Sequence, residues 1–88
     1  MNIRQLAEQA KSQMAEITGL KPLNVIEIFK DQRGWHVGLD MLEMSRIPTA
    51  TDILGEYEIL MDDEGNALTF VRKRTRLRGE PMEKGENG

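Results

Sequence analysis

Cysteine is absent from all 88 residues, and histidine occurs once, as His36. Without thiols no disulfide can stabilise the fold. A secreted domain this small would often need one, so the composition favours a reducing, intracellular setting. A metal site needs several converging ligands and an activated nucleophile needs a basic partner, and the residue spacing offers neither. We therefore expect no catalytic residue, no metal and no cofactor.

Long apolar runs are also missing. No segment approaches the roughly 20 apolar residues that cross a bilayer, and mean hydropathy is −0.52. The first residues are charged, unlike the apolar region of a signal peptide. These patterns predict a cytoplasmic, soluble protein with no membrane partner.

The length and the mixture of 39% hydrophobic and 31% charged residues are typical of one small soluble domain. We place this domain at residues 1–79. The last nine residues, 80–88, combine glycine, proline and acidic side chains without periodicity. That composition predicts a disordered acidic tail.

The first segment has the spacing of an amphipathic helix. Its apolar residues recur at helical intervals along one stripe, and they are Ile3, Leu6, Ala7, Ala10, Met14 and Ile17. Gly19 can adopt the left-handed conformation that ends helices, and Pro22 follows it. The pattern predicts a helix over about residues 2–18.

Four strands are expected after the helix. Residues 23–30 and 35–44 flank a turn that ends in glycine, and Trp35, Val37, Leu39 and Met41 alternate with polar or small residues. Pro48 interrupts the sheet, and residues 49–52 can cap a single helical turn that contains Ile53 and Leu54. A second alternating pair, residues 56–62 and 67–77, surrounds a glycine-containing loop. We predict an α+β fold in which the N-terminal amphipathic helix packs on a four-stranded antiparallel sheet made of two hairpins, with a meander as the simplest strand order.

The last strand concentrates positive charge. Residues 72–79 carry five basic groups and no acidic one, whereas residues 1–71 carry twelve acidic groups against six basic ones. In a regular strand Arg72, Arg74, Arg76 and Arg78 would extend the face begun by Leu68 and Phe70. Guanidinium groups match carboxylates in paired hydrogen bonds, so this row and Phe70 are candidate contacts for an acidic protein partner. Two other interpretations stay open, namely protection of an edge strand and pairing with Glu56 and Glu58 across the hairpin.

A second group of residues surrounds the break at Pro48. Arg46 stands between Glu43 and Asp52, where an ion pair could lock the chain reversal or form a recognition notch. Tyr57 follows, and alternation points its ring toward the core. His36, out of phase with Trp35 and Val37, is expected to face solvent or the second face of the sheet.

The segment from Trp35 to Arg78 resembles the gas vesicle protein O family. The resemblance is carried in order by Trp35, Glu43, Arg46-Ile47-Pro48, Asp52, Tyr57-Glu58, Asp62, Gly65 and the arginine-rich last strand. Members are accessory proteins encoded in gas vesicle gene clusters, and they assist formation of the hollow shell rather than form its wall.

This resemblance implies a non-enzymatic accessory protein that binds other gas vesicle proteins, shell or accessory, in the cytoplasm or on the vesicle. Self-association stays open. The alternative is a regulatory protein that binds nucleic acid through the basic last strand. The acidic remainder of the chain opposes phosphate, so nucleic acid is the less favoured partner.

Overall fold

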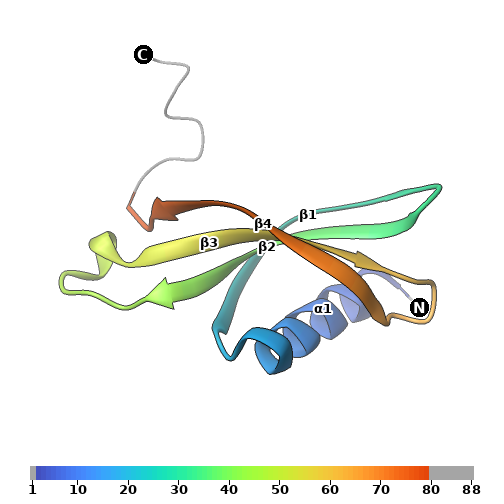
Figure 1. The fold of residues 1–88 in the computed structure, drawn as a ribbon, viewed down its shortest axis with the longest axis horizontal. Coiled ribbons are helices and arrows are strands. Elements are labelled where there is room, and N and C mark those ends of the chain that lie inside the picture. The colour runs from blue at the N-terminus through green and yellow to red at the C-terminus, as the bar shows by residue number, and fades with distance from the viewer. Residues whose placement is uncertain (1, 80–88) are drawn as a thin grey trace, which may run out of the picture.

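The computed structural model describes residues 2–79, which form one helix followed by four strands (Figure 1). The elements are α1 (Ile3–Thr18), β1 (Lys21–Asp31), β2 (Gly34–Met44), a 3₁₀ turn (Thr49–Thr51), β3 (Ile53–Met61) and β4 (Ala67–Leu77). The predicted acidic tail, residues 80–88, lies outside the described residues.

The sheet is an antiparallel meander in the order β1-β2-β3-β4, with α1 packed on one face. The predicted α+β fold and strand order are therefore confirmed. One boundary prediction was wrong: Ile53 and Leu54 begin β3 instead of continuing the helical turn. Their pairing with Leu77 and Arg76 of β4 extends the strand toward the chain reversal.

The ends of α1 follow from its terminal residues. Asn2 caps the first turn by accepting a hydrogen bond from the Gln5 backbone N–H, and the Gln5 side chain accepts the Asn2 N–H in return. Gly19 ends the helix at φ 76°, where residues with a Cβ are strained. The predicted apolar stripe is buried only in its middle, because Ile3 and Ile17 remain 59% and 53% exposed.

The main core lies between α1 and the sheet face that we call the helix face. Leu6, Ala10 and Met14 of α1 pack there in one cluster with β2 and β3. The strand residues of that cluster are Val37, Leu39, Met41, Tyr57, Ile59 and Met61. Period-two alternation correctly predicted these inward positions, including that of Tyr57.

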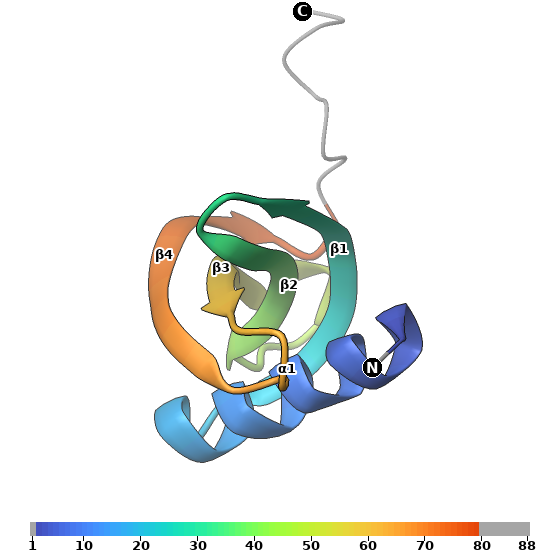
Figure 2. The same ribbon diagram turned by 90° about the vertical axis from the view of Figure 1, so that its right-hand side faces the viewer.

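The opposite side, which we call the second face, is also partly closed. The sheet is strongly coiled, so that its edge strands β1 and β4 curve around the middle strands (Figure 2). Three polar side chains on this face, those of His36, Asp40 and Glu56, are buried although no helix of residues 2–79 covers them. The second face therefore has an interior of its own, and that interior is charged.

Candidate functional site

Two β-bulges on β4 decide where its arginines point. Residues 69 to 72 pair regularly with β3, but Leu68 and Lys73 are extra residues at either end of that stretch. Because one extra residue reverses the alternation, Arg72 shares the helix face with Tyr57, whereas Arg74 lies opposite Glu56 on the second face. The expectation that all four arginines continue one face is therefore wrong.

The second-face arginines are bonded to buried carboxylates. Arg76 Nη2 lies 2.6 Å from Asp40 Oδ2, and Arg76 Nε lies 3.3 Å from Glu56 Oε2. Arg74 Nε donates to the other Glu56 oxygen at 2.8 Å. Pairing across the hairpin, one of the interpretations left open by the sequence, is thus confirmed for Glu56, whereas Glu58 pairs with Lys73 at 2.9 Å.

Asp40 is the carboxylate of this cluster whose burial costs the most free energy. Its side chain is 3% exposed, and its Oδ1 has no hydrogen-bond partner among the described residues. Burial raises the pKa of the Asp40 carboxyl, and the nearby Glu56 charge raises it further, while Arg76 opposes the rise. Arg76 therefore compensates a charge that the fold has removed from water.

On the helix face, Glu43 joins two partners from different strands. Glu43 is the extra residue of a bulge in β2, which turns its carboxylate over Gly55. Tyr57 Oη donates to Glu43 Oε2 at 2.8 Å, and Arg72 donates from Nε at 3.0 Å and from Nη2 at 2.6 Å. Although burial raises the pKa of Glu43, these bonds from Arg72 and Tyr57 outweigh it and hold the pKa below its ordinary value.

The ion pair expected around Pro48 is made by a different arginine. Asp52 Oδ1 accepts the backbone N–H of Arg46 at 2.7 Å, while Oδ2 accepts Nη1 of Arg78 at 3.0 Å. Within residues 2–79 the Arg46 guanidinium makes no salt bridge, so it does not join Glu43 to Asp52 as expected. Pro48 follows a cis peptide bond and accepts the Thr51 hydroxyl hydrogen. Arg72 of β4 pairs with Glu43 in its place, and Arg78, directly after β4, pairs with Asp52.

His36 lies on the second face as expected but is buried. Its Nδ1 is 2.5 Å from Glu58 Oε2, and its Nε2 is 2.9 Å from Asp31 Oδ1, outside hydrogen-bond geometry. The Phe29 ring stacks on the imidazole with centroids 4.5 Å apart. The adjacent carboxylates, that of Asp31 first and that of Glu58 second, raise the pKa of His36 against the effect of burial.

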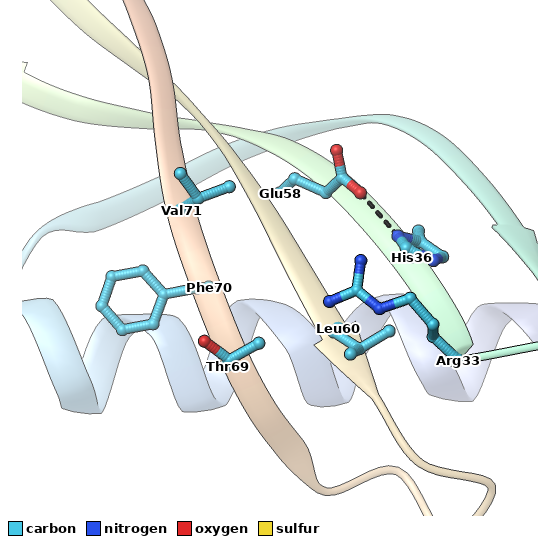
Figure 3. Close-up of a pocket in the computed structure, with 7 residues that line it drawn as sticks. All are labelled: Arg33, His36, Glu58, Leu60, Thr69, Phe70 and Val71. Carbon is cyan, nitrogen blue, oxygen red and sulfur yellow. Dashed lines mark hydrogen bonds and ion pairs between the residues drawn. The ribbon is translucent and has the colours of Figure 1, made fainter.

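Two hollows lie on either side of β4. The second-face hollow has a volume of about 370 Å³ and is lined by Arg33, His36, Glu58, Leu60, Thr69, Phe70 and Val71 (Figure 3). The helix-face hollow, about 270 Å³, is lined by Ile17, Ala67, Leu68, Thr69 and Phe70. Phe70, a predicted partner contact, borders both and remains 39% exposed.

Sequence reasoning missed Gly55, Asp40 and Arg33. Gly55 matters because a Cβ there would overlap the Glu43 carboxylate. Asp40 could have been found, since alternation places it beside Glu56 on adjacent strands. Arg33 lies in the β1–β2 turn and gave no signal before the sheet was known to coil.

Among the described residues, the structure adds no candidates for metal binding or for crossing a membrane. Across residues 2–79, no group of three His, Cys, Asp or Glu side chains is placed to hold a metal ion. The helix found in that part of the chain is neither long nor apolar enough to cross a membrane.

Comparison with known proteins decides the family. The sequence profile described as gas vesicle synthesis protein GvpO matches residues 1–82. The chain belongs to the gas vesicle protein O family. It is 31% identical over 70 residues to gas vesicle protein O of Streptomyces sp. (strain CB03234), and the alignment covers 80% of this chain. Because it covers 55% of that relative, the chain spans about half the relative's length. No solved structure matches the chain significantly.

Family membership confirms the resemblance and identifies a gas vesicle accessory protein. Residues that carried the resemblance now have structural partners: Glu43 contacts Tyr57, and Asp52 contacts the Arg46 backbone. In this member of the gas vesicle protein O family, these motif residues hold the chain reversal against β4.

Proposed function

We propose that this chain is a non-enzymatic accessory protein that binds other gas vesicle proteins in the cytoplasm while the shell assembles. It holds aggregation-prone shell or accessory subunits until nucleation or elongation. Membership of the gas vesicle protein O family supports the setting. The open edge of β4 is the observation that carries the binding role.

β4 ends the sheet, and among residues 2–79 no strand pairs with its outer edge. Three apolar side chains project near that edge: Leu68, Phe70 and Val71 are 56%, 39% and 55% exposed. An edge strand offers unpaired N–H and C=O groups, and exposed apolar side chains beside it favour contact with another chain. Strand addition would supply main-chain hydrogen bonds to a gas vesicle protein.

The predicted arginine contacts divide by exposure. The side chains of Arg72, Arg74 and Arg78 are 52%, 67% and 41% exposed, so each retains donors directed to solvent. Arg76 is 15% exposed and bonded to two carboxylates. As partner contacts we therefore propose the three exposed arginines and Phe70, with Arg76 supporting the strand from within.

Nucleic-acid binding gains little from this arrangement. A carboxylate already faces each of the three arginines of β4 and also Arg78 just beyond it, which lowers the positive field that attracts phosphate. A salt titration separates the two functions, because phosphate binding weakens steeply as salt rises.

The first experiment deletes this gene from a complete gas vesicle cluster and supplies the chain in trans, with vesicles scored by electron microscopy. Loss of vesicles and their restoration are expected. Normal vesicles after deletion would contradict an assembly role.

Arg74→Glu then tests partner capture, with Arg4→Glu as the control because Arg4 is an exposed residue of α1. We expect Arg74→Glu to reduce co-purification of gas vesicle proteins from the cluster and Arg4→Glu to leave it unchanged. Equal capture by both variants would remove β4 from the proposed interface. Thermal unfolding of both variants checks that the fold is retained.

A further inference from the structure

The outer edge of β4 offers a short regular stretch, Thr69–Arg72, between two bulges. These four residues lie opposite Leu60–Tyr57 of β3 in unbroken register. About half of the main-chain N–H and C=O groups of an edge strand point away from the sheet. Bulges interrupt pairing, so the stretch between them is the part of β4 that can accept an added strand.

Both hollows border this same stretch. Thr69 and Phe70 line the second-face hollow and also the helix-face hollow. Successive side chains of a strand point to opposite faces. A strand paired with Thr69–Arg72 would therefore direct its side chains alternately toward one hollow and toward the other.

The two hollows differ in chemistry. Apart from Thr69, the residues that line the helix-face hollow have apolar side chains and none is charged, and Ile17 is 53% exposed there. In the second-face hollow, the guanidinium of Arg33 extends over β3 toward β4 (Figure 3).

The charges around Arg33 leave it available to a ligand. No carboxylate within residues 2–79 forms a salt bridge with Arg33. Glu58 in the same hollow is already bonded to Lys73 and His36. Arg72, at the end of the stretch, lies on the helix face and is bonded to Glu43, so it does not compete with Arg33 for a ligand on the second face. The helix-face side thus suits an apolar side chain, and the opposite side suits a carboxylate.

We propose that the edge at Thr69–Arg72 binds an extended segment of a partner protein in which apolar and acidic side chains alternate. The apolar side chains enter the hollow beside Ile17, and the acidic ones approach Arg33. This inference rests on the proposed function, because it names the chemistry of the bound gas vesicle protein. A second copy of β4 fits less well, since it would bring Arg72, Lys73 and Arg74 of two molecules together.

The test uses the full chain and three synthetic peptides of about seven residues, the length of a typical strand. One alternates valine with glutamate, one alternates valine with lysine, and one has the composition of the first with its valines and glutamates in separate blocks. Amide chemical shifts report the binding site. We expect saturable binding of the alternating valine–glutamate peptide alone, with the largest shifts at residues 69–72.

Two variants with matched controls test the hollows separately. Ile17→Ser is compared with Ile3→Ser, which is equally exposed near the other end of α1. Arg33→Glu is compared with Arg4→Glu. Ile17→Ser and Arg33→Glu should each weaken binding about fivefold to tenfold, a size expected for one exposed contact, whereas both controls should leave it unchanged.

Several results would overturn this proposal. They are absent binding, equal binding of the lysine or block peptide, shifts centred on β1, equal weakening by a control variant, and peptide-independent self-association through β4. In cells, the double variant Ile17→Ser/Arg33→Glu is compared with the wild-type chain in the deletion strain. If both restore vesicles equally, the docking edge is rejected and the assembly role is retained. Normal vesicles in the deletion strain would instead reject the assembly role.

Discussion

Arg76 Nη2 lies 2.6 Å from Asp40 Oδ2, and the two side chains are only 15% and 3% exposed. The same guanidinium reaches Glu56, so one arginine compensates two buried carboxylates on the sheet face opposite α1. The interior of the second face therefore depends on Arg76 more than on any exposed arginine of β4.

Arg76→Met should destabilise the fold by about 3–5 kcal/mol, because it leaves buried charge without a partner. Urea unfolding at neutral pH measures the loss. Arg74→Gln is the control: Arg74 is 67% exposed and Glu56 keeps its bond to Arg76, so the cost should be about 1 kcal/mol or less. Adding Asp40→Asn to Arg76→Met should recover part of the stability. Equal costs for the two arginines would contradict this account.

Gly55 is needed for the approach of Glu43 to Tyr57. A Cβ at Gly55 would overlap Glu43 Oε2 and lie 2.8 Å from Tyr57 Cε1. Gly55→Ala should therefore displace the carboxylate and cost about 2–3 kcal/mol, through lost hydrogen bonds and overpacking. Urea unfolding measures the change.

Gly38→Ala is the matched control in β2, because the near neighbour of its Cβ would be the flexible Glu27 side chain, with Cγ at 3.3 Å, while the Glu27 backbone N lies at an ordinary contact distance of 3.9 Å. Its effect should stay within about 1 kcal/mol. In a Glu43→Ala background, Gly55→Ala should lose most of its cost, since the displaced group is gone. A cost unchanged by Glu43→Ala would mean that Gly55 acts through Tyr57 packing alone.

Alternation and helical spacing were sufficient to predict α1, the strands and the inward position of Tyr57, because each depends on local periodicity. They failed at the bulges of β4 and β2. Lys73 is an extra residue in β4 and Glu43 is one in β2, and both have ordinary side chains, so nothing in the sequence marks where the alternation reverses. For that reason the sequence assigned the ion pairs near Pro48 to Arg46, whereas Arg72 and Arg78 make them. The pairing of Arg74 with Glu56 needed only the hairpin register, and it was among the predicted alternatives.

Asp52 ties the chain reversal to the end of β4. Its two carboxylate oxygens accept from the Arg46 backbone and the Arg78 guanidinium, and its own C=O accepts the Arg78 N–H at 2.8 Å. Asp52→Ala should open this end locally at a cost of about 2 kcal/mol. Hydrogen exchange of the Arg46 amide should accelerate, while amides of α1 should not change.

Asp62→Ala is the control for Asp52→Ala, because Asp62 also accepts backbone N–H groups but only within its own turn, from Glu64 and Asn66. It should leave the Arg46 amide protected. Unchanged exchange at Arg46 in Asp52→Ala would show that the 3₁₀ turn is held by its backbone bonds instead.

His36 and its two neighbouring carboxylates, Asp31 and Glu58, should make the free energy of unfolding depend on pH in opposite directions. Its pKa is raised above the ordinary value of 6.5 by Asp31 and Glu58. The protonated form therefore stabilises the fold fully below pH 6.5, and this contribution disappears as pH rises through the raised pKa. The pKa values of Asp31 and Glu58 are lowered, by His36 and by Lys73 respectively as the largest causes, so their contributions are present above the ordinary carboxyl range and disappear in acid.

His36→Gln removes the titrating ring and keeps a polar side chain of similar reach. The difference in unfolding free energy between wild type and His36→Gln should be larger at about pH 5.5 than at about pH 9, because the contribution of the imidazolium is lost as pH rises through the raised pKa of His36. Glu58 raises the pKa of Lys73, so Lys73 alters the size of the difference and not its sign. A difference that is constant with pH would mean that His36 contributes through its stacking on Phe29. A difference that grows toward alkaline pH would reverse the sign assigned to the Asp31–His36–Glu58 cluster.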